Sequence, residues 1–150
     1  LDYQSRTSVQ LAKVLLAQYW NKEVEFLIAT EGYINEISGT TAGVIIGDRA
    51  FASLNRFWHL YDLGLSWKQY SGLPFVFAAW VANKPIPAAF MEAFEAANGY
   101  GLAHLEEVIA LIPAAEQVYD LHKYYTENIS YAFTAEKKKG LDSFLKLMQP

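Results

Sequence analysis

Three hydroxyl side chains and an arginine stand together at the start of a predicted helix, in the stretch Ser5-Arg6-Thr7-Ser8 of LDYQSRTSVQLAKVLL. The N-terminus of a helix leaves backbone N–H groups unpaired and carries partial positive charge, so it can hold a carboxylate or a phosphate. Hydroxyls and a guanidinium at the same place add further hydrogen-bond donors. The other interpretation is helix capping, which the residues alone favour because serine and threonine commonly cap helix starts.

A second candidate for chemistry is the carboxylate of Asp48, in the sequence IGDRA. It follows an apolar run that is typical of a strand buried on both faces. In open α/β sheets, ligands bind beyond the carboxyl ends of the strands, so this position favours a role in lining a site. The alternative is that Asp48 caps a helix, and the residues taken alone favour that alternative.

Metal and thiol chemistry find little support in the sequence. His59, His104 and His122 are scattered and show no spacing of a metal site, so we interpret them as structural or surface residues. The absence of cysteine removes disulfides, thiol catalysis and cysteine-ligated metals. The motifs GxSxG, GxGxxG and the P-loop are also absent. No metal and no cofactor are therefore expected.

Composition indicates one globular chain. Of its 150 residues, 53% are hydrophobic and 19% are charged, which excludes a disordered protein. The net charge of −4 argues against a nucleic-acid binder, although a local site for a small anion stays compatible with it. No apolar run reaches the roughly 18 residues of a membrane span, and no signal peptide is visible. We expect a cytoplasmic protein that does not interact with a membrane.

Apolar residues spaced by three and four predict an amphipathic helix over Ser5–Trp20. From Pro85 onward the pattern is mostly helical, with Pro87 at a helix start and Pro113 between two helices. A closing helix is predicted over Lys137–Met148.

Strands are predicted between these helices, at Val24–Ala29, Ala42–Asp48, Phe57–Gly64 and Leu73–Ala82. In the last of them, the aromatic residues Phe75, Phe77 and Trp80 are expected in the core. Strands that alternate with helices favour an α/β fold, here a mixed sheet flanked by helices with a helical C-terminal segment.

Three stretches taken in order are more specific than any one of them: LDYQSRTSVQLAKVLL, AGVIIGDRA and YDLGLSWKQYSGLPFVFAAW. Together they resemble the chorismate dehydratase family of the futalosine route to menaquinone. The resemblance covers essentially the whole chain and is strongest over Leu1–Trp80. A sister enzyme of the same route, a naphthoate synthase, differs at the helix start and at the strand matching LPFVFAAW, which favours the dehydratase.

The resemblance implies a periplasmic-binding-protein-like (type 2) fold, in which two α/β lobes enclose a ligand cleft. By that likeness, residues 1–72 form the second lobe. Residues 73–150 then supply a return strand and C-terminal helices that pack on the first lobe. The first part of that lobe is expected to be absent from this chain, so the activity of the chain alone is an open question.

The activity implied by the resemblance is that of a lyase, which removes water from chorismate to give 3-[(1-carboxyvinyl)oxy]benzoate. Chorismate carries two carboxylates. With the family in view, Ser5, Arg6, Thr7 and Ser8 are predicted to bind one of them, and Asp48 to line the site. The residues identify no general base.

Two other interpretations stay open. A solute-binding protein for a small carboxylate would use the same cleft without chemistry. A single lobe would expose apolar surface and associate with another copy, which makes a homo-oligomer an expected outcome.

Overall fold

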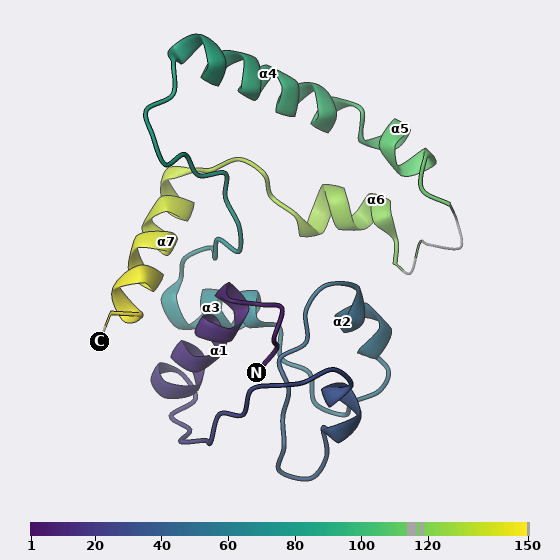
Figure 1. The fold of residues 1–150 in the computed structure, drawn as a ribbon, viewed down its shortest axis with the longest axis vertical. Coiled ribbons are helices and arrows are strands. Elements are labelled where there is room, and N and C mark those ends of the chain that lie inside the picture. Colours follow the sequence, from purple (N-terminus) through teal and green to yellow (C-terminus); the bar gives the residue numbers. More distant parts are fainter. Residues whose placement is uncertain (114–116, 118, 150) are drawn as a thin grey trace. The chain divides into compact units, whose positions relative to one another are not determined.

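The computed structural model describes residues 1–113, 117 and 119–149. These residues form helices joined by irregular segments (Figure 1). They divide into two compact units. The first unit comprises Leu1–Ala79 and the stretch from Phe133 onward, and the second comprises Trp80–Ala132.

The described residues of the first unit form four α-helices and one 3-10 helix. In chain order they are α1 (Thr7–Gln18), η1 (Tyr33–Glu36), α2 (Asp48–Ser53), α3 (Leu63–Ser71) and α7 (Ala135–Leu147). The helix predicted at the start of the chain is confirmed as α1, and the predicted closing helix is confirmed as α7.

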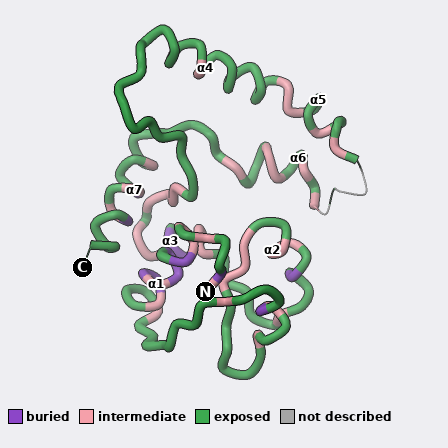
Figure 2. The backbone as a smooth tube through the Cα atoms, in the orientation of Figure 1, coloured by how far each residue is buried: buried purple, intermediate pink, exposed green. Residues whose placement is uncertain are grey.

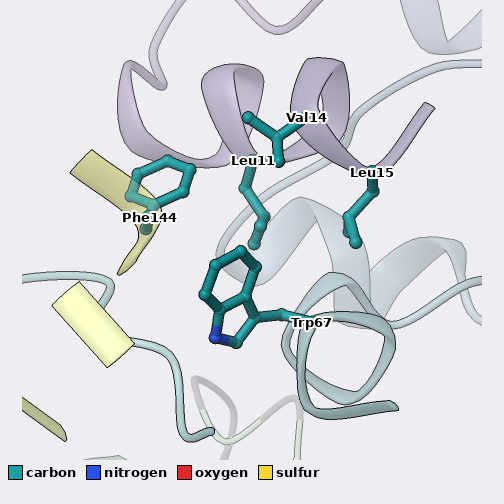
Figure 3. Packing of buried hydrophobic residues seen from close by; sticks show 5 residues of the cluster. All are labelled: Leu11, Val14, Leu15, Trp67 and Phe144. Carbon is teal, nitrogen blue, oxygen red and sulfur yellow. The ribbon is translucent and has the colours of Figure 1, made fainter. Parts of the chain in front are cut away.

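The core of the first unit lies where α1 meets α3. On α1, Val14 and Leu15 follow Leu11 by three and four residues, so the three side chains lie on one face of the helix. They pack against Trp67 of α3 and Phe144 of α7, as Figure 3 shows. The core therefore joins helices from the two ends of the sequence.

Helix α3 begins and ends where its capping residues dictate. The Oδ1 atom of Asp62 accepts a hydrogen bond from the N–H of Leu65 at 2.7 Å, which satisfies one of the free donors of the first turn. Gly72 ends the helix in the left-handed conformation, with φ +72°, and its N–H donates to the carbonyl of Lys68. The strand predicted over Phe57–Gly64 is therefore wrong, since its last residues start this helix.

The predicted mixed sheet, and with it the periplasmic-binding-protein-like α/β fold, is wrong for this chain. None of the described residues lies in a strand. Val24–Ala29 and Leu73–Ala82 belong to no helix or strand, and Ala42–Asp48 is irregular until α2 begins at its last residue. The physical reason is that a strand is stable only when a second strand satisfies its backbone groups.

Two hydrogen bonds are the trace of strand pairing that the structure retains. Leu1 N donates to the carbonyl of Leu27 at 2.7 Å, and the N–H of Ala29 donates to the carbonyl of Leu1 at 3.0 Å. The side chain between these two partners, Ile28, is 85% exposed. One bridge with an exposed apolar residue is too little pairing to make a sheet.

The three aromatic residues of Leu73–Ala82 differ in their burial. Phe75 packs against the core beside Trp67, as predicted. Phe77 contacts Phe75 edge-to-face yet stays half exposed. Trp80 is 84% exposed and contacts the ring of Phe94 within the second unit, so the expectation of a core position for it is wrong.

The regular elements among the described residues of the second unit are helical. They are α4 (Ala88–Ala103), α5 (Leu105–Ala110), α6 (Leu121–Lys123) and the π-helical turn η3 (Tyr124–Asn128). Pro87 is the N-cap of α4, which confirms the predicted helix start. Figure 2 shows that the described residues of this unit are exposed or intermediate in burial, while the buried residues lie in the first unit.

No helix in the part of the chain that the structure describes is long and apolar enough to cross a membrane.

Candidate functional site

The segment before α1 is held by a serine cap. Ser5 Oγ accepts a hydrogen bond from the N–H of Ser8 at 3.1 Å, which satisfies one of the free donors of the first turn. The capping interpretation is therefore confirmed for Ser5. Arg6, the residue just before the helix, makes no capping hydrogen bond with its side chain.

The other polar side chains at this helix start are available to bind a ligand. Within the described residues, the side chains of Arg6, Thr7 and Ser8 have no hydrogen-bond or ion-pair partner. Arg6 is exposed, and Thr7 and Ser8 are intermediate in burial. The helix start therefore offers two hydroxyls and a guanidinium, together with the dipole of a helix of 12 residues.

A buried carboxylate lies immediately before this helix start. The side chain of Asp2 is fully buried, and both of its oxygens are engaged. Oδ1 accepts a hydrogen bond from the N–H of Gln4 at 2.7 Å. Oδ2 accepts from the hydroxyl of Tyr33 and from Nη2 of Arg49, each at 2.8 Å. We call Asp2, Tyr33 and Arg49 the Asp2 network.

The electrostatics of the Asp2 network keep its carboxylate ionised. Burial by itself raises the pKa of Asp2, but the hydrogen bonds from Gln4, Tyr33 and Arg49 and the charge of Arg49 outweigh burial and lower it. For Tyr33, burial and the neighbouring Asp2 carboxylate raise the pKa of the phenol. At neutral pH the network therefore consists of a carboxylate, a neutral phenol and a guanidinium.

Arg49 connects the Asp2 network to α2. It is the second residue of this helix, and its guanidinium also lies over the ring of Tyr3, 5.6 Å from the ring centroid. The arginine side chain keeps 31% of its surface exposed, while that of Asp2 has none. The ion pair thus reaches from the interior to the surface.

Tyr33 adds a third segment to the network. Its hydroxyl lies within hydrogen-bond distance of the carbonyl of Val44 as well as of Asp2. Because a phenol has one proton, it donates to one of these two acceptors at a time. Val44 belongs to the stretch that leads into α2, so Tyr33 braces the approach to that helix.

Asp48 is the first residue of α2 and is exposed. The N-cap of α2 is Gly47, with φ +62°, so the alternative prediction that Asp48 caps this helix is wrong. Like the side chains of Arg6, Thr7 and Ser8, that of Asp48 has no hydrogen-bond or ion-pair partner in the described ranges. Asp48 is adjacent to Arg49, so the Asp2–Arg49 pair ties the two candidate segments to each other.

No local sequence pattern predicts the Asp2 network. Tyr33 and Arg49 are 31 and 47 residues away from Asp2. Arg49 lies in AGVIIGDRA and Asp2 in LDYQSRTSVQLAKVLL, whereas Tyr33 lies in neither stretch. A buried carboxylate requires partners, but Asp2 is followed by polar residues in LDYQSR, so its burial is not marked in the sequence.

The histidines do not gather into a metal site. His122 Nε2 lies 2.9 Å from an oxygen of Glu106, and His104 stacks on Tyr100. His59 is exposed. In the ranges that the structure describes, no three His, Cys, Asp or Glu side chains come together in a way that could hold a metal ion.

Asp2 is expected to make the stability of the fold depend on pH. Its folded-state pKa lies below the ordinary value of 3.8, so the stabilisation is fully present above that value. It is lost as the pH falls through the folded-state pKa. The free energy of unfolding, measured with urea at stepped pH, should differ most between the wild type and Asp2→Asn near neutral pH. The difference should shrink below about pH 4. A constant difference down to about pH 2.5 would contradict this assignment.

Comparison with known sequences places the chain in a family. Residues 1–150 match the family described as menaquinone biosynthesis, so the chain belongs to this family. It is similar to the chorismate dehydratase of Thermus thermophilus, with 30% identity over 176 aligned positions. That alignment covers 99% of this chain and 61% of the relative, so the chain spans about three fifths of the relative's length. No solved structure matches the chain.

Proposed function

We propose that the protein is a chorismate dehydratase, a hydro-lyase that converts chorismate to 3-[(1-carboxyvinyl)oxy]benzoate and water. Membership of the menaquinone biosynthesis family supports this proposal, as does the likeness to the Thermus enzyme along nearly the whole chain. The structural observation that carries it is the start of α1, where the side chains of Arg6, Thr7 and Ser8 have no partner within the described residues.

The start of α1 suits one carboxylate of chorismate. The hydroxyls of Thr7 and Ser8 donate to the carboxylate oxygens, and Arg6 supplies a compensating charge. The partial positive charge of the helix end adds to the attraction. Ser5 contributes mainly by capping, because its Oγ already accepts the N–H of Ser8. Asp48 has an open carboxylate and is assigned to the lining of the same site.

The reaction asks little covalent chemistry of the protein. A ring proton and a neighbouring hydroxyl leave as water, and the ring becomes aromatic, which supplies much of the driving force. The protein then has to orient chorismate and stabilise the charge that develops as these groups leave. The open donors at α1 are suited to orientation, and no residue is assigned here as the general base.

The direct test is turnover by the full-length protein. Incubation with chorismate is expected to consume it with many turnovers and to yield a product with a benzenoid absorbance. A stoichiometric spectral shift without turnover would instead favour the second candidate, a solute-binding protein for a small carboxylate. No change in chorismate and no binding of it would reject both.

Thr7→Ala is expected to raise the KM for chorismate about tenfold, because one hydrogen bond to a charged group is lost. The Thr7 hydroxyl has no partner in the described part of the chain, so the substitution should leave stability nearly unchanged. Thr7→Ser is the matched control, since it keeps the hydroxyl and should keep the KM. Initial rates over a range of chorismate concentrations measure both variants. Equal KM values for Thr7→Ala and the wild type would return this helix start to a structural role.

A cytoplasmic location, a homo-oligomer, and the division of the chain at residue 72 stay predictions from the sequence.

A further inference from the structure

Both oxygens of the Asp2 carboxylate are occupied, and each holds a different part of the chain. Oδ1 binds the N–H of Gln4, only two residues away, and so fixes the local path of the backbone. Oδ2 binds Tyr33 and Arg49, which come from η1 and α2. A buried carboxylate with three donors has little freedom to change its orientation.

The hydrogen bond to Gln4 is followed directly by the cap of α1. Gln4 precedes Ser5, whose Oγ accepts the N–H of Ser8. Two successive side chain-to-backbone hydrogen bonds therefore fix the chain from Asp2 to Ser8. The open hydroxyls of Thr7 and Ser8 lie at the end of this fixed path, so their position depends on Asp2.

The ion pair with Arg49 fixes the same path relative to α2. Arg49 follows Asp48 directly and lies in the first turn of α2. Its guanidinium contacts the side chains of two consecutive residues, the carboxylate of Asp2 and the ring of Tyr3. Because the ion pair joins residues 47 apart in the sequence, it constrains the geometry of the two segments whatever its net contribution to stability.

We infer that Asp2 is a positioning residue, whose carboxylate holds Gln4, Tyr33 and Arg49 and thereby sets the start of α1 against the first turn of α2. It acts on the ligand through these segments and does not touch the ligand itself. The part of this inference that concerns chorismate binding rests on the proposed function. The geometric part, the fixing of the segment from Gln4 to Ser8, stands independently of it.

The test substitutes Asp2→Asn in the full-length protein. Asparagine has nearly the same size and keeps an acceptor for Gln4, but it removes the charge that holds Arg49. The KM for chorismate is expected to rise about tenfold while kcat stays within about twofold, since a small misplacement of a binding group weakens binding strongly. Hydrogen exchange of the amides from Gln4 to Ser8 should become faster.

Two controls separate positioning from stability alone. Asp62→Asn is the same substitution at the cap of α3, outside the Asp2 network, and should leave the KM unchanged. Gly140→Ala in α7 is expected to lower stability without touching the network, and should also leave the KM unchanged. If either control raises the KM as much as Asp2→Asn does, the positioning role is rejected.

Arg49→Met keeps the inference testable if Asp2→Asn fails to fold. Arg49→Met should reproduce the rise in KM, and the Asp2→Asn/Arg49→Met double variant should be no worse than the stronger single variant, because both act through one ion pair. A folded Asp2→Asn or Arg49→Met with the wild-type KM would overturn the inference.

Failure of the proposed function is distinguishable from failure of this inference. If the wild type neither binds nor converts chorismate, the function is rejected, yet amide exchange still tests the positioning role. Faster exchange from Gln4 to Ser8 in Asp2→Asn, with Asp62→Asn unchanged in this segment, supports it. Unchanged exchange in Asp2→Asn overturns it.

Discussion

Replacement of Trp67 by alanine is expected to lower the free energy of unfolding by about 3–5 kcal/mol. Trp67 is fully buried and lies at the centre of the core of the first unit. Its ring meets Tyr70, Phe75 and Phe144 at centroid distances of 5.6–6.0 Å. Truncation removes these contacts and leaves a cavity between α1, α3 and α7, which these helices would have to move to fill.

Trp67→Phe is the matched control and is expected to cost less than about 2 kcal/mol. Phenylalanine keeps one aromatic ring in place and removes the rest of the indole, including its N–H, for which the described residues offer no acceptor. Because a buried donor without an acceptor is unfavourable, its removal offsets part of the lost volume. Urea unfolding followed by far-ultraviolet circular dichroism measures both variants without relying on tryptophan fluorescence. Equal losses for the two variants would contradict this expectation, because they would show that a single aromatic ring does not preserve the packing of the core.

Gly140→Ala is expected to lower the free energy of unfolding by about 1–3 kcal/mol. A Cβ at this position would lie 2.1 Å from the carbonyl oxygen of Pro74, which belongs to the backbone and cannot rotate away. Helix α7 would have to move off the chain segment that follows α3. This cost outweighs the gain of about 1 kcal/mol that alanine brings over glycine inside a helix.

Gly99→Ala provides the opposite expectation within the same protein. Gly99 also lies inside a helix, α4, but nothing lies within 4 Å of the added Cβ. The substitution Gly99→Ala should therefore raise the free energy of unfolding by up to about 1 kcal/mol. Thermal unfolding of the two variants, followed by circular dichroism, compares them directly. A stabilising effect of Gly140→Ala would show that α7 and Pro74 are not in close contact.

Helices could be predicted from this sequence and strands could not, for a physical reason. The helix α1 satisfies its hydrogen bonds within a dozen residues, so the spacing of Leu11 and Leu15 and the hydroxyls before it were sufficient to predict it. A run such as Ala42–Asp48 has strand-like composition, but a strand also requires a partner, and composition carries no information about the partner. The strand-like segments here remain without one in the described residues.

The candidate site could be predicted to the same extent, from local signals alone. The cap by Ser5 follows from its position before α1, and the structure shows it. The pairing of Asp2 with Arg49 joins residues 47 apart, and no periodicity or motif relates them. Single residues of the site can thus be proposed from sequence, whereas the contacts that position them appear only in the fold.

The contact between Trp67 and Phe144 closes a long loop in the chain, because the whole second unit, Trp80–Ala132, lies between the two residues. The entropy lost on closing a flexible loop grows only with the logarithm of its length, so doubling the loop costs about 0.6 kcal/mol more. The closure cost therefore varies only weakly with the length of the second unit. Insertions or deletions within Trp80–Ala132 change the folding free energy of the first unit by little, which leaves this stretch free to vary in length.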